Sequence, residues 1–225
     1  MTYNFQQYQS VKLVAHSKSN ISDVSDEGII AYMARVSNPD NQMNNETAPK
    51  LLAYLLKHKH FSPFEMVSIT LEINTTRDIG RQILRHRSFS FQEVSLRYSE
   101  ASLFTNRECR IQDHKNRQNS FVTEDNNLAD YWGIVQNEVQ NLAYERYKEA
   151  LARGVAKEQA RALLPEGMVM SKLYMAGTLR SWLHYIQLRQ SIETQKEHRD
   201  IALKAKTIIL TELYPSLSAY LKEDV

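Results

Sequence analysis

The most regular pattern of apolar and polar positions in the chain lies over residues 67–73. Apolar side chains occupy every second position of this segment, and polar side chains occupy the positions between them. A period of two is that of a β-strand, and residues branched at Cβ, which favour strands, are frequent here. Residues 11–16 alternate less regularly, and we expect a second, shorter strand there.

Most other regular segments carry apolar residues three and four positions apart, which places them on one face of a helix. This spacing predicts helices over residues 26–36, 48–57, 126–152, 168–189 and 194–213, with a short one ending at Leu164. A further helix should run from Arg77 to about Arg87, with Thr75 or Thr76 as its N-cap. We expect Gly154 to end the long amphipathic helix over 126–152.

The order of these elements indicates the fold class. It runs from strand to helices to strand and then to helices alone, whereas strands and helices keep alternating in an α/β protein. Residues 102–124 are polar and irregular, and we interpret them as a long surface loop or flap. We therefore expect a single α+β domain over residues 1–225 with a helical C-terminal half.

Composition argues against several other classes of protein. With 28 Lys and Arg against 26 Asp and Glu, the formal net charge is +2, and 42% of the residues are apolar. This balance argues against disorder and against a protein that mainly coats nucleic acid. The only cysteine, Cys109, cannot form a disulfide within one chain and cannot build a cysteine-based zinc site.

Nothing in the sequence indicates a membrane segment or an export signal. There is no run of about 18 apolar residues, and residues 1–6 lack a basic region followed by an apolar run. We therefore expect a soluble cytoplasmic protein that has no membrane partner.

The densest cluster of polar and charged residues lies at 81–98. On the predicted helix, Arg77, Arg81 and Arg85 recur every four residues and share a face, with one acidic neighbour. Stacked arginines repel one another unless something anionic lies between them. Hydroxyl residues and Arg97 follow, and arginines beside hydroxyls are typical of a phosphate or nucleotide site. The alternatives are an ordinary exposed basic helix and one that binds the backbone of a nucleic acid.

The residues at the end of this helix form a gapped motif of Arg85-His86-Arg87, two residues, Ser90, four residues, Ser95, one residue and Arg97. This motif resembles the signature of the flavin-dependent thymidylate synthases, and every fixed position is met. Three further segments resemble elements of the same family, namely 60–65 (His-Phe-Ser-Pro-Phe-Glu), 161–165 (Arg-Ala-Leu-Leu-Pro) and 179–189. The resemblance spans about residues 34–203, which is most of the chain.

The resemblance implies an antiparallel or mixed sheet with flanking helices, and it assigns roles to residues by position. The family's FAD contacts fall on Ser62, Arg85, His86, Arg87, Glu93, Thr178, Arg180 and His184. Its dUMP contacts fall on Gln82, Arg85, Glu93, Ser95, Arg97, Arg161 and Arg189. His60 falls in the flavin and folate region. Thr178 and His184 stand where many members have asparagine, and residues 166–175 also depart from the common form.

The resemblance also implies a reaction and an assembly. FAD would be the cofactor, NADPH and 5,10-methylenetetrahydrofolate the co-substrates, and dUMP would be methylated to dTMP in a homotetramer with shared sites. Arg189 would be the catalytic residue that polarises the uracil at N3, without a metal and without a protein nucleophile. Cys109 fits this expectation, because it lacks the Pro-Cys-Gln setting of the cysteine-dependent thymidylate synthases. A flavin-binding relative without synthase activity remains an alternative.

Several other polar residues are interpreted as structural. His16, His114 and His198 show no partner pattern, and residues 196–199 are interpreted as a solvated helix face. Ser95 lacks the Gly-x-Ser-x-Gly turn of a nucleophilic serine, so we expect its hydroxyl to bind substrate.

Overall fold

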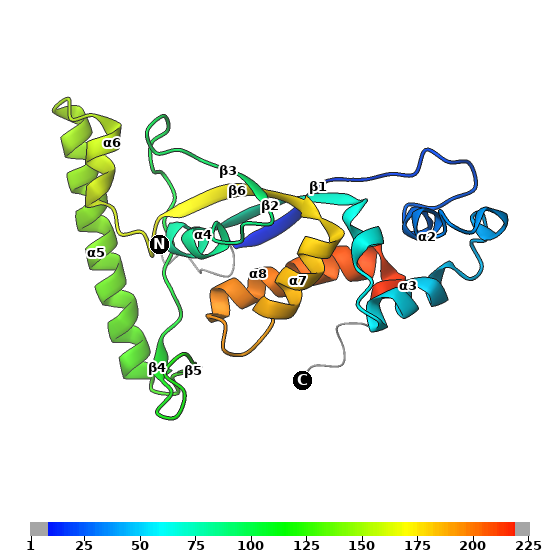
Figure 1. Ribbon diagram of the computed structural model, residues 1–225. Coiled ribbons are helices and arrows are strands. Elements are labelled where there is room, and N and C mark those ends of the chain that lie inside the picture. The colour runs from blue at the N-terminus through cyan, green and yellow to red at the C-terminus, as the bar shows by residue number, and fades with distance from the viewer. Residues whose placement is uncertain (1–8, 219–225) are drawn as a thin grey trace.

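The computed structural model describes residues 9–218 (Figure 1). Residues 1–6, in which no export signal is expected, lie outside the described part of the chain. One antiparallel sheet contains, in spatial order, β1 (Ser10–His16), β2 (Ser68–Thr76), β6 (Met170–Thr178) and β3 (Ser90–Glu93). The expected α+β class with an antiparallel sheet is confirmed.

Helices form most of the rest of the molecule. They are α2 (Gly28–Ala34), α3 (Ala48–Lys57), α4 (Arg77–Ile83), α5 (Asn126–Ala152), α6 (Lys157–Ala160), α7 (Leu179–Arg189) and α8 (Lys196–Thr207). Tighter turns lie at Pro39–Asn41, Ser62–Glu65, Arg161–Leu163 and Pro215–Leu217, and a wider turn, Ile208–Leu213, continues α8. Helices α3 and α5 have the bounds that the sequence predicts. Gly154, with a φ of 87°, follows the end of α5 as expected.

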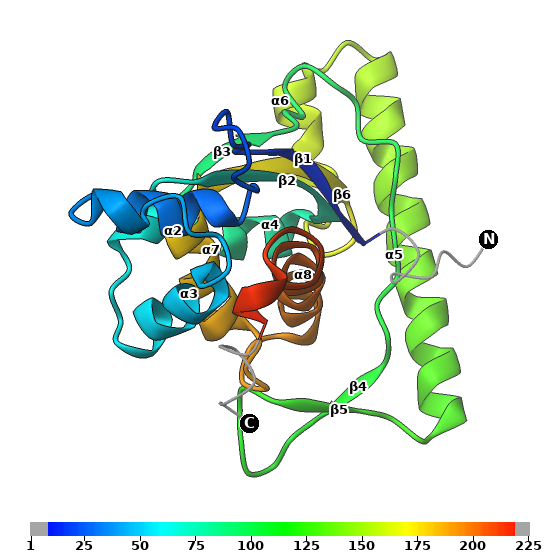
Figure 2. The same ribbon diagram turned by 90° about the vertical axis from the view of Figure 1, so that its right-hand side faces the viewer.

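Strand β2 places its apolar side chains on one face of the sheet. Ile69, Leu71 and Ile73 have no exposed surface, as the alternation predicts. Helices α4, α7 and α8 pack beneath this face, and no helix covers the opposite face in Figures 1 and 2. Trp182 of α7 is fully buried in the core, and its indole N–H donates to the carbonyl of Ile69 (3.1 Å). The sheet thus holds its helices on a single side.

The largest difference from the sequence-based expectation concerns residues 168–189. The single helix expected there is wrong, because its first half is strand β6, which lies inside the sheet. This strand is rich in Met, Leu, Ala and Lys, which favour helices. Its side chains nevertheless alternate, with Leu173 and Met175 buried and Lys172 and Tyr174 exposed. Pairing with all nine residues of β2 stabilises this segment as a strand rather than a helix. The C-terminal half is therefore not wholly helical.

Helix α4 follows Thr76 and ends at Ile83, four residues earlier than expected. Beyond it the chain turns, since the N–H of His86 donates to the carbonyl of Ile83 (3.0 Å). Arg85 lies in this turn. It therefore does not share a helix face with the two arginines that precede it.

Residues 102–124 are more ordered than the loop expected from the sequence. Phe104 is buried and forms an isolated bridge with Val169. Strands β4 (Arg110–Gln112) and β5 (Ser120–Val122) pair as a hairpin that lies beside one end of α5 (Figure 2). We call this hairpin, residues 110–122, the hairpin arm.

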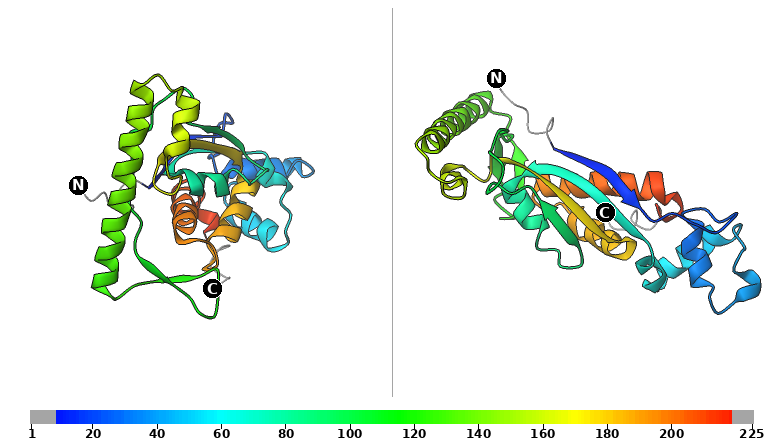
Figure 3. Two further views of the ribbon diagram at one scale, coloured as in Figure 1. Left: turned by 90° about the vertical axis from the view of Figure 1, so that its left-hand side faces the viewer. Right: turned by 90° about the horizontal axis from the view of Figure 1, so that it is seen from above.

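Helix α5 stands at one side of the molecule, apart from the sheet (Figure 3). Of its 27 residues, Gln136 and Tyr147 are buried, and Tyr147 belongs to a second, smaller apolar cluster. Tyr131, Ile134 and Leu142 are more than half exposed. Within residues 9–218 no helix is both long enough and apolar enough to cross a membrane.

Gly177 of β6 provides a test of this packing. A Cβ added there would lie 2.4 Å from Cδ1 of Phe89, whose ring packs edge-on against Trp182. We expect Gly177→Ala to lower the free energy of unfolding by about 1–3 kcal/mol, because the buried ring must move. Gly133→Ala on α5 is the matched control, since nothing lies within 4 Å of the added atom, and it should be neutral or stabilising by up to about 1 kcal/mol. Urea unfolding measures both, and equal effects would contradict the packing described.

Candidate active site

The turn after α4 presents two exposed arginines. Arg85 and Arg87 are exposed, and neither side chain forms an ion pair or a hydrogen bond with any residue in the range 9–218. The carbonyl of the next residue, Ser88, accepts a hydrogen bond from the hydroxyl of Ser181 on α7 (3.3 Å). The turn is thereby fixed to α7 while its two guanidinium groups remain free to bind an anion.

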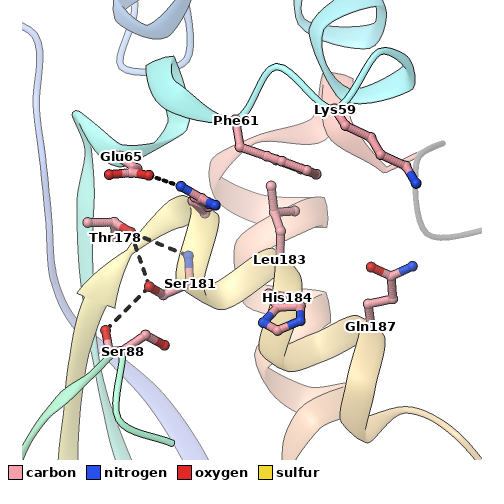
Figure 4. Close-up of a pocket in the computed structure, with 10 residues that line it drawn as sticks. Lys59, Phe61, Glu65, Ser88, Thr178, Ser181, Leu183, His184 and Gln187 are labelled. Atoms are coloured by element: carbon pink, nitrogen blue, oxygen red, sulfur yellow. Dashed lines mark hydrogen bonds and ion pairs between the residues drawn. The ribbon is translucent and has the colours of Figure 1, made fainter.

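A cavity of about 680 Å³ lies beside this turn, at the start of α7 (Figure 4). We call it the α7 cavity, and its lining residues are Lys59, Phe61, Glu65, Ser88, Thr178, Arg180, Ser181, Leu183, His184 and Gln187. Arg180 forms an ion pair with Glu65, and its guanidinium carbon lies 5.7 Å from the centre of the Phe61 ring. The hydroxyl oxygen of Thr178 accepts from the N–H of Ser181 and so caps α7. The lining thus combines hydroxyls, cations and an aromatic ring.

Three of the residues that the sequence assigns to FAD line the α7 cavity together. Arg180 and His184 are one helical turn apart on α7, and Thr178 precedes the helix, so helical spacing turns them toward one side. Both departures from the family pattern, Thr178 and His184, are therefore lining residues. Ser62 and His60 lie close to this region in sequence but do not line the cavity.

At its other end α7 meets the turn through a pair of side chains. The Nε–H of Arg189 donates to Nε2 of His86 (3.0 Å). Burial, together with the positive Arg189, lowers the pKa of His86 to about 4, so the ring is neutral at pH 7. A neutral ring that accepts at Nε2 carries its proton on Nδ1. His86 is therefore an uncharged acceptor that holds one edge of the Arg189 guanidinium.

A second neutral histidine lies directly behind this pair. His198 of α8 has no exposed surface, and its ring centre is 6.0 Å from that of His86. Burial, together with the positive Arg189, lowers the pKa of His198 to about 3. Its Nδ1 lies 3.2 Å from Oε1 of Gln82. The interpretation of residues 196–199 as a solvated face is thus wrong, because Glu197 and His198 are buried.

The other group of predicted substrate residues lies near α6. A cavity of about 420 Å³, the α6 cavity, is lined by Arg77, Arg81, Leu96, Glu158, Arg161, Ala162, Leu164 and Glu166. Nε of Arg97 donates to Glu158 (3.1 Å), and Nε of Arg161 donates to the carbonyl of the same residue (3.2 Å). The hydroxyl of Ser95 accepts from the N–H of Arg97 (3.3 Å). The structure therefore brings Ser95, Arg97 and Arg161 together.

The stacked arginines of α4 find their counter-charge inside the protein. Arg81 donates to Glu166 (2.9 Å), and Arg77 lies 4.0 Å from Glu166 and 3.7 Å from Glu93. Arg77 is 8% exposed. The expected basic face is therefore largely neutralised, which removes the feature on which the nucleic-acid alternative depends. Glu93 also accepts from the hydroxyl of Ser171 (2.7 Å).

Sequence reasoning missed the carboxylates at 158 and 166 and the buried histidine at 198. The acidic residues are 61 and 85 positions from their arginine partners, and no local pattern connects them. For His198 a signal was present, because it lies three residues before the buried Ile201 on the same helix face. Within residues 9–218 no group of three or more His, Cys, Asp or Glu side chains could hold a metal ion.

Fold and site together define an α+β protein whose free arginines are arranged for anionic ligands. The family model for the thymidylate synthase complementing protein matches residues 18–216. A probable flavin-dependent thymidylate synthase of Paramecium bursaria Chlorella virus 1 is 46% identical, with 93% of this chain and 97% of that protein covered. The flavin-dependent thymidylate synthase of Synechocystis sp. is 50% identical, with 88% and 91% covered.

A solved structure has a similar fold. The UMP/dUMP methylase PolB from Streptomyces cacaoi, bound with 5-Br dUMP, is similar with a TM-score of 0.81 and 26% identity. The similarity covers 94% of this chain and 93% of that chain. The chain belongs to the flavin-dependent thymidylate synthase family.

The two neutral histidines predict that stability depends on pH. Their pKa values are about 4 and about 3 in the folded chain, against about 6.5 in the unfolded chain, so the unfolded chain binds more protons below pH 6.5. The free energy of unfolding should have its full value above pH 7, where both histidines are neutral in the folded and in the unfolded chain. It should fall from pH 6.5 to about 4 for His86 and to about 3 for His198, by roughly 1–2 kcal/mol per histidine at pH 5, with less from the half-buried His86.

Urea unfolding at pH 7.5 and pH 5.0 measures this dependence. The variant His198→Asn should lose about half of the difference between the two pH values. The control His114→Asn, on the exposed turn of the hairpin arm, should keep all of it. Equal pH dependence in the wild type and His198→Asn would show that the histidine is not buried in its neutral form.

Proposed function

We propose that the protein converts dUMP, 5,10-methylenetetrahydrofolate and NADPH to dTMP, tetrahydrofolate and NADP⁺ in the cytoplasm, with FAD as its cofactor. One observation carries this proposal, namely the difference between paired and free arginines. Arg77 and Arg81 are paired with carboxylates of the chain itself, whereas Arg85 and Arg87 have no such partner in the described residues. Free guanidinium groups beside a cavity that is partly lined by hydroxyls and an arginine favour a phosphate-bearing cofactor.

The residues at the α7 cavity suit FAD in their chemistry. Hydroxyls, an arginine and a histidine line it beside an aromatic ring, and a flavin cofactor combines a flat ring system with phosphates. The residues that would hold it are Ser62, Arg85, His86, Arg87, Glu93, Thr178, Arg180 and His184. When bound, FAD would supply the redox chemistry, by accepting hydride from NADPH and passing it to the transferred one-carbon group. His60 would lie at the boundary with the folate.

Arg189 would be the catalytic residue. Its guanidinium, held at Nε by His86, would place its remaining N–H groups against N3 and the flanking carbonyl of the uracil. Such donors stabilise the negative charge that develops when C5 becomes nucleophilic. A neutral His86 orients the guanidinium and leaves its positive charge in place. A carboxylate in the same position would neutralise that charge. Gln82, Arg85, Glu93, Ser95, Arg97 and Arg161 would bind the rest of dUMP.

The only thiol of the chain lies away from these residues. Cys109 precedes the hairpin arm, and its sulfur lies 3.9 Å from the carbonyl of Leu128 on α5. It lines a cavity together with Trp132 and Tyr131, and no residue assigned to FAD or dUMP lines that cavity. This placement favours a mechanism without a protein nucleophile.

We also propose that the sites are completed in a homotetramer. Thr178 and the residues around Arg161 lie at opposite ends of the β6 region, and β6 is nine residues, or roughly 30 Å, long. One chain therefore spreads its predicted ligand residues over two cavities. The exposed apolar side chains of α5 are available to a second subunit.

The cofactor assignment is tested by Arg87→Ala. Because this side chain is exposed and has no partner in residues 9–218, the variant should keep the stability of the wild type but bind FAD about ten- to a hundredfold more weakly. The matched control is Arg117→Ala, which removes another exposed arginine, from the hairpin arm. Flavin fluorescence titration measures the affinities. If both variants bind FAD as the wild type does, Arg87 does not contact the cofactor.

The mechanism is tested by comparing Arg189→Ala with Cys109→Ala. Losing a guanidinium aimed at developing charge should lower the rate of dTMP formation a hundredfold or more, about 3–4 kcal/mol, whereas the thiol variant should keep most of its activity. Rates are measured with saturating substrates in protein that retains FAD. An inactive but folded Cys109→Ala beside a nearly normal Arg189→Ala would contradict the proposed mechanism.

A further inference from the structure

A chain of hydrogen bonds connects Gln82 to a buried ion pair on α8. Gln82 Nε2 donates to Oε1 of Gln195 (2.7 Å), and Nε2 of Gln195 donates to Glu197 (3.0 Å). Glu197 is 3% exposed and forms an ion pair with Arg110 (2.5 Å). Burial alone would raise the pKa of Glu197, but Arg110 holds it below its usual value, so the carboxylate is ionised. The chain therefore ends on a group that can only accept hydrogen bonds.

This end point fixes the direction of every bond in the chain. Because Glu197 only accepts, Gln195 must turn its NH₂ group toward Glu197 and its carbonyl oxygen toward Gln82. Gln82 must then turn its own NH₂ group toward Gln195, which leaves its carbonyl oxygen facing His198. The ring nitrogen at that position, Nδ1, is 3.2 Å away and has to carry the proton.

The hydrogen bond with Gln82 is the one polar contact that the His198 ring forms among residues 9–218. Nε2 is buried and has no hydrogen-bond partner within residues 9–218. The ring otherwise lies beside the rings of Tyr185 (5.8 Å) and His86 (6.0 Å). A buried nitrogen without a partner costs free energy, which an apolar side chain of similar size would avoid. A histidine differs from such an apolar side chain in that its Nδ1 can form a hydrogen bond with Gln82.

We propose that His198 is a positioning residue that locks the side-chain amide of Gln82 in one orientation in the nucleotide site. The inference rests on the proposed function, in which Gln82 binds dUMP. With both of its ends engaged, the amide cannot flip, so its second N–H and its second carbonyl lone pair keep fixed directions. A pyrimidine edge offers donors and acceptors in a fixed order, and a fixed amide can discriminate between them. Gln82 itself would touch the ligand, and His198 would act through it.

Two substitutions separate this role from packing. His198→Leu removes the N–H donor together with the unpartnered nitrogen, whereas His198→Asn can place its amide N–H where Nδ1–H was. In FAD-loaded enzyme, His198→Leu should weaken dUMP binding about three- to tenfold, with unchanged FAD content and without loss of stability. His198→Asn should restore the wild-type affinity to within about twofold. His114→Leu serves as the control for an exposed histidine.

A double-mutant cycle tests the coupling between the two residues. In the Gln82→Ala background, His198→Leu should have no further effect on the dissociation constant of dUMP measured by calorimetry. Equal effects of His198→Leu in both backgrounds, or unchanged affinity in His198→Leu itself, would overturn the proposal. A loss of affinity that His198→Asn does not restore would also overturn it, because it would indicate packing rather than hydrogen bonding.

A measurement without dUMP keeps this inference separate from the proposed function. In ¹⁵N-histidine-labelled protein, the ring of His198 should be the Nδ1–H tautomer, and its signals should change in Gln82→Ala. An Nε2–H tautomer would overturn the positioning role whatever the ligand. If the wild type bound no dUMP, the proposed function would fail, and the tautomer of His198 would still decide whether it orients Gln82.

Discussion

The pairing of β2 with β6 is the constraint on which the rest of the structure depends. All nine residues of each strand are paired, from Ser68 opposite Thr178 to Thr76 opposite Met170. Helix α4 leaves β2 at one end of this pair, and α7 leaves β6 at the other. Both helices then pack on the same face of the sheet (Figure 1). The α7 cavity and the α6 cavity consequently lie at opposite ends, each beside the start of one helix.

Because α4 and α7 start at opposite ends of the strand pair and run toward each other, the contact between His86 and Arg189 lies between the two cavities. Their C-terminal ends approach each other, so the turn after α4 brings His86 to Arg189 at the last residue of α7. Helix α8 closes this region from beneath with His198. Burial keeps both histidines neutral, and His86 accepts from Arg189 and orients it without removing its charge. A cation prepared in this way stabilises charge that appears only during a reaction.

The sequence predicted those parts of the molecule that local patterns determine. The bounds of α3 and α5 and the buried face of β2 follow from spacing. The gapped motif marked the arginines at 85 and 87, but the turn that carries them was expected to be helix. Strand β6 could not be recognised in this way, because its helix-favouring residues become a strand only by pairing with β2, which lies about a hundred residues earlier. The same holds for Glu166, whose ion pair with Arg81 connects residues 85 positions apart. Of the residues assigned to ligands, Thr178, Arg180 and His184 line the α7 cavity and Arg161 lines the α6 cavity.

The most direct test of the central claim is the visible absorption spectrum of the purified protein, recorded before and after NADPH is added without oxygen. A flavin-dependent thymidylate synthase should be yellow, should release FAD when it is denatured, and should lose its flavin absorption when NADPH reduces the cofactor. A colourless protein that carries no FAD and does not take it up from solution would contradict the function proposed for this chain.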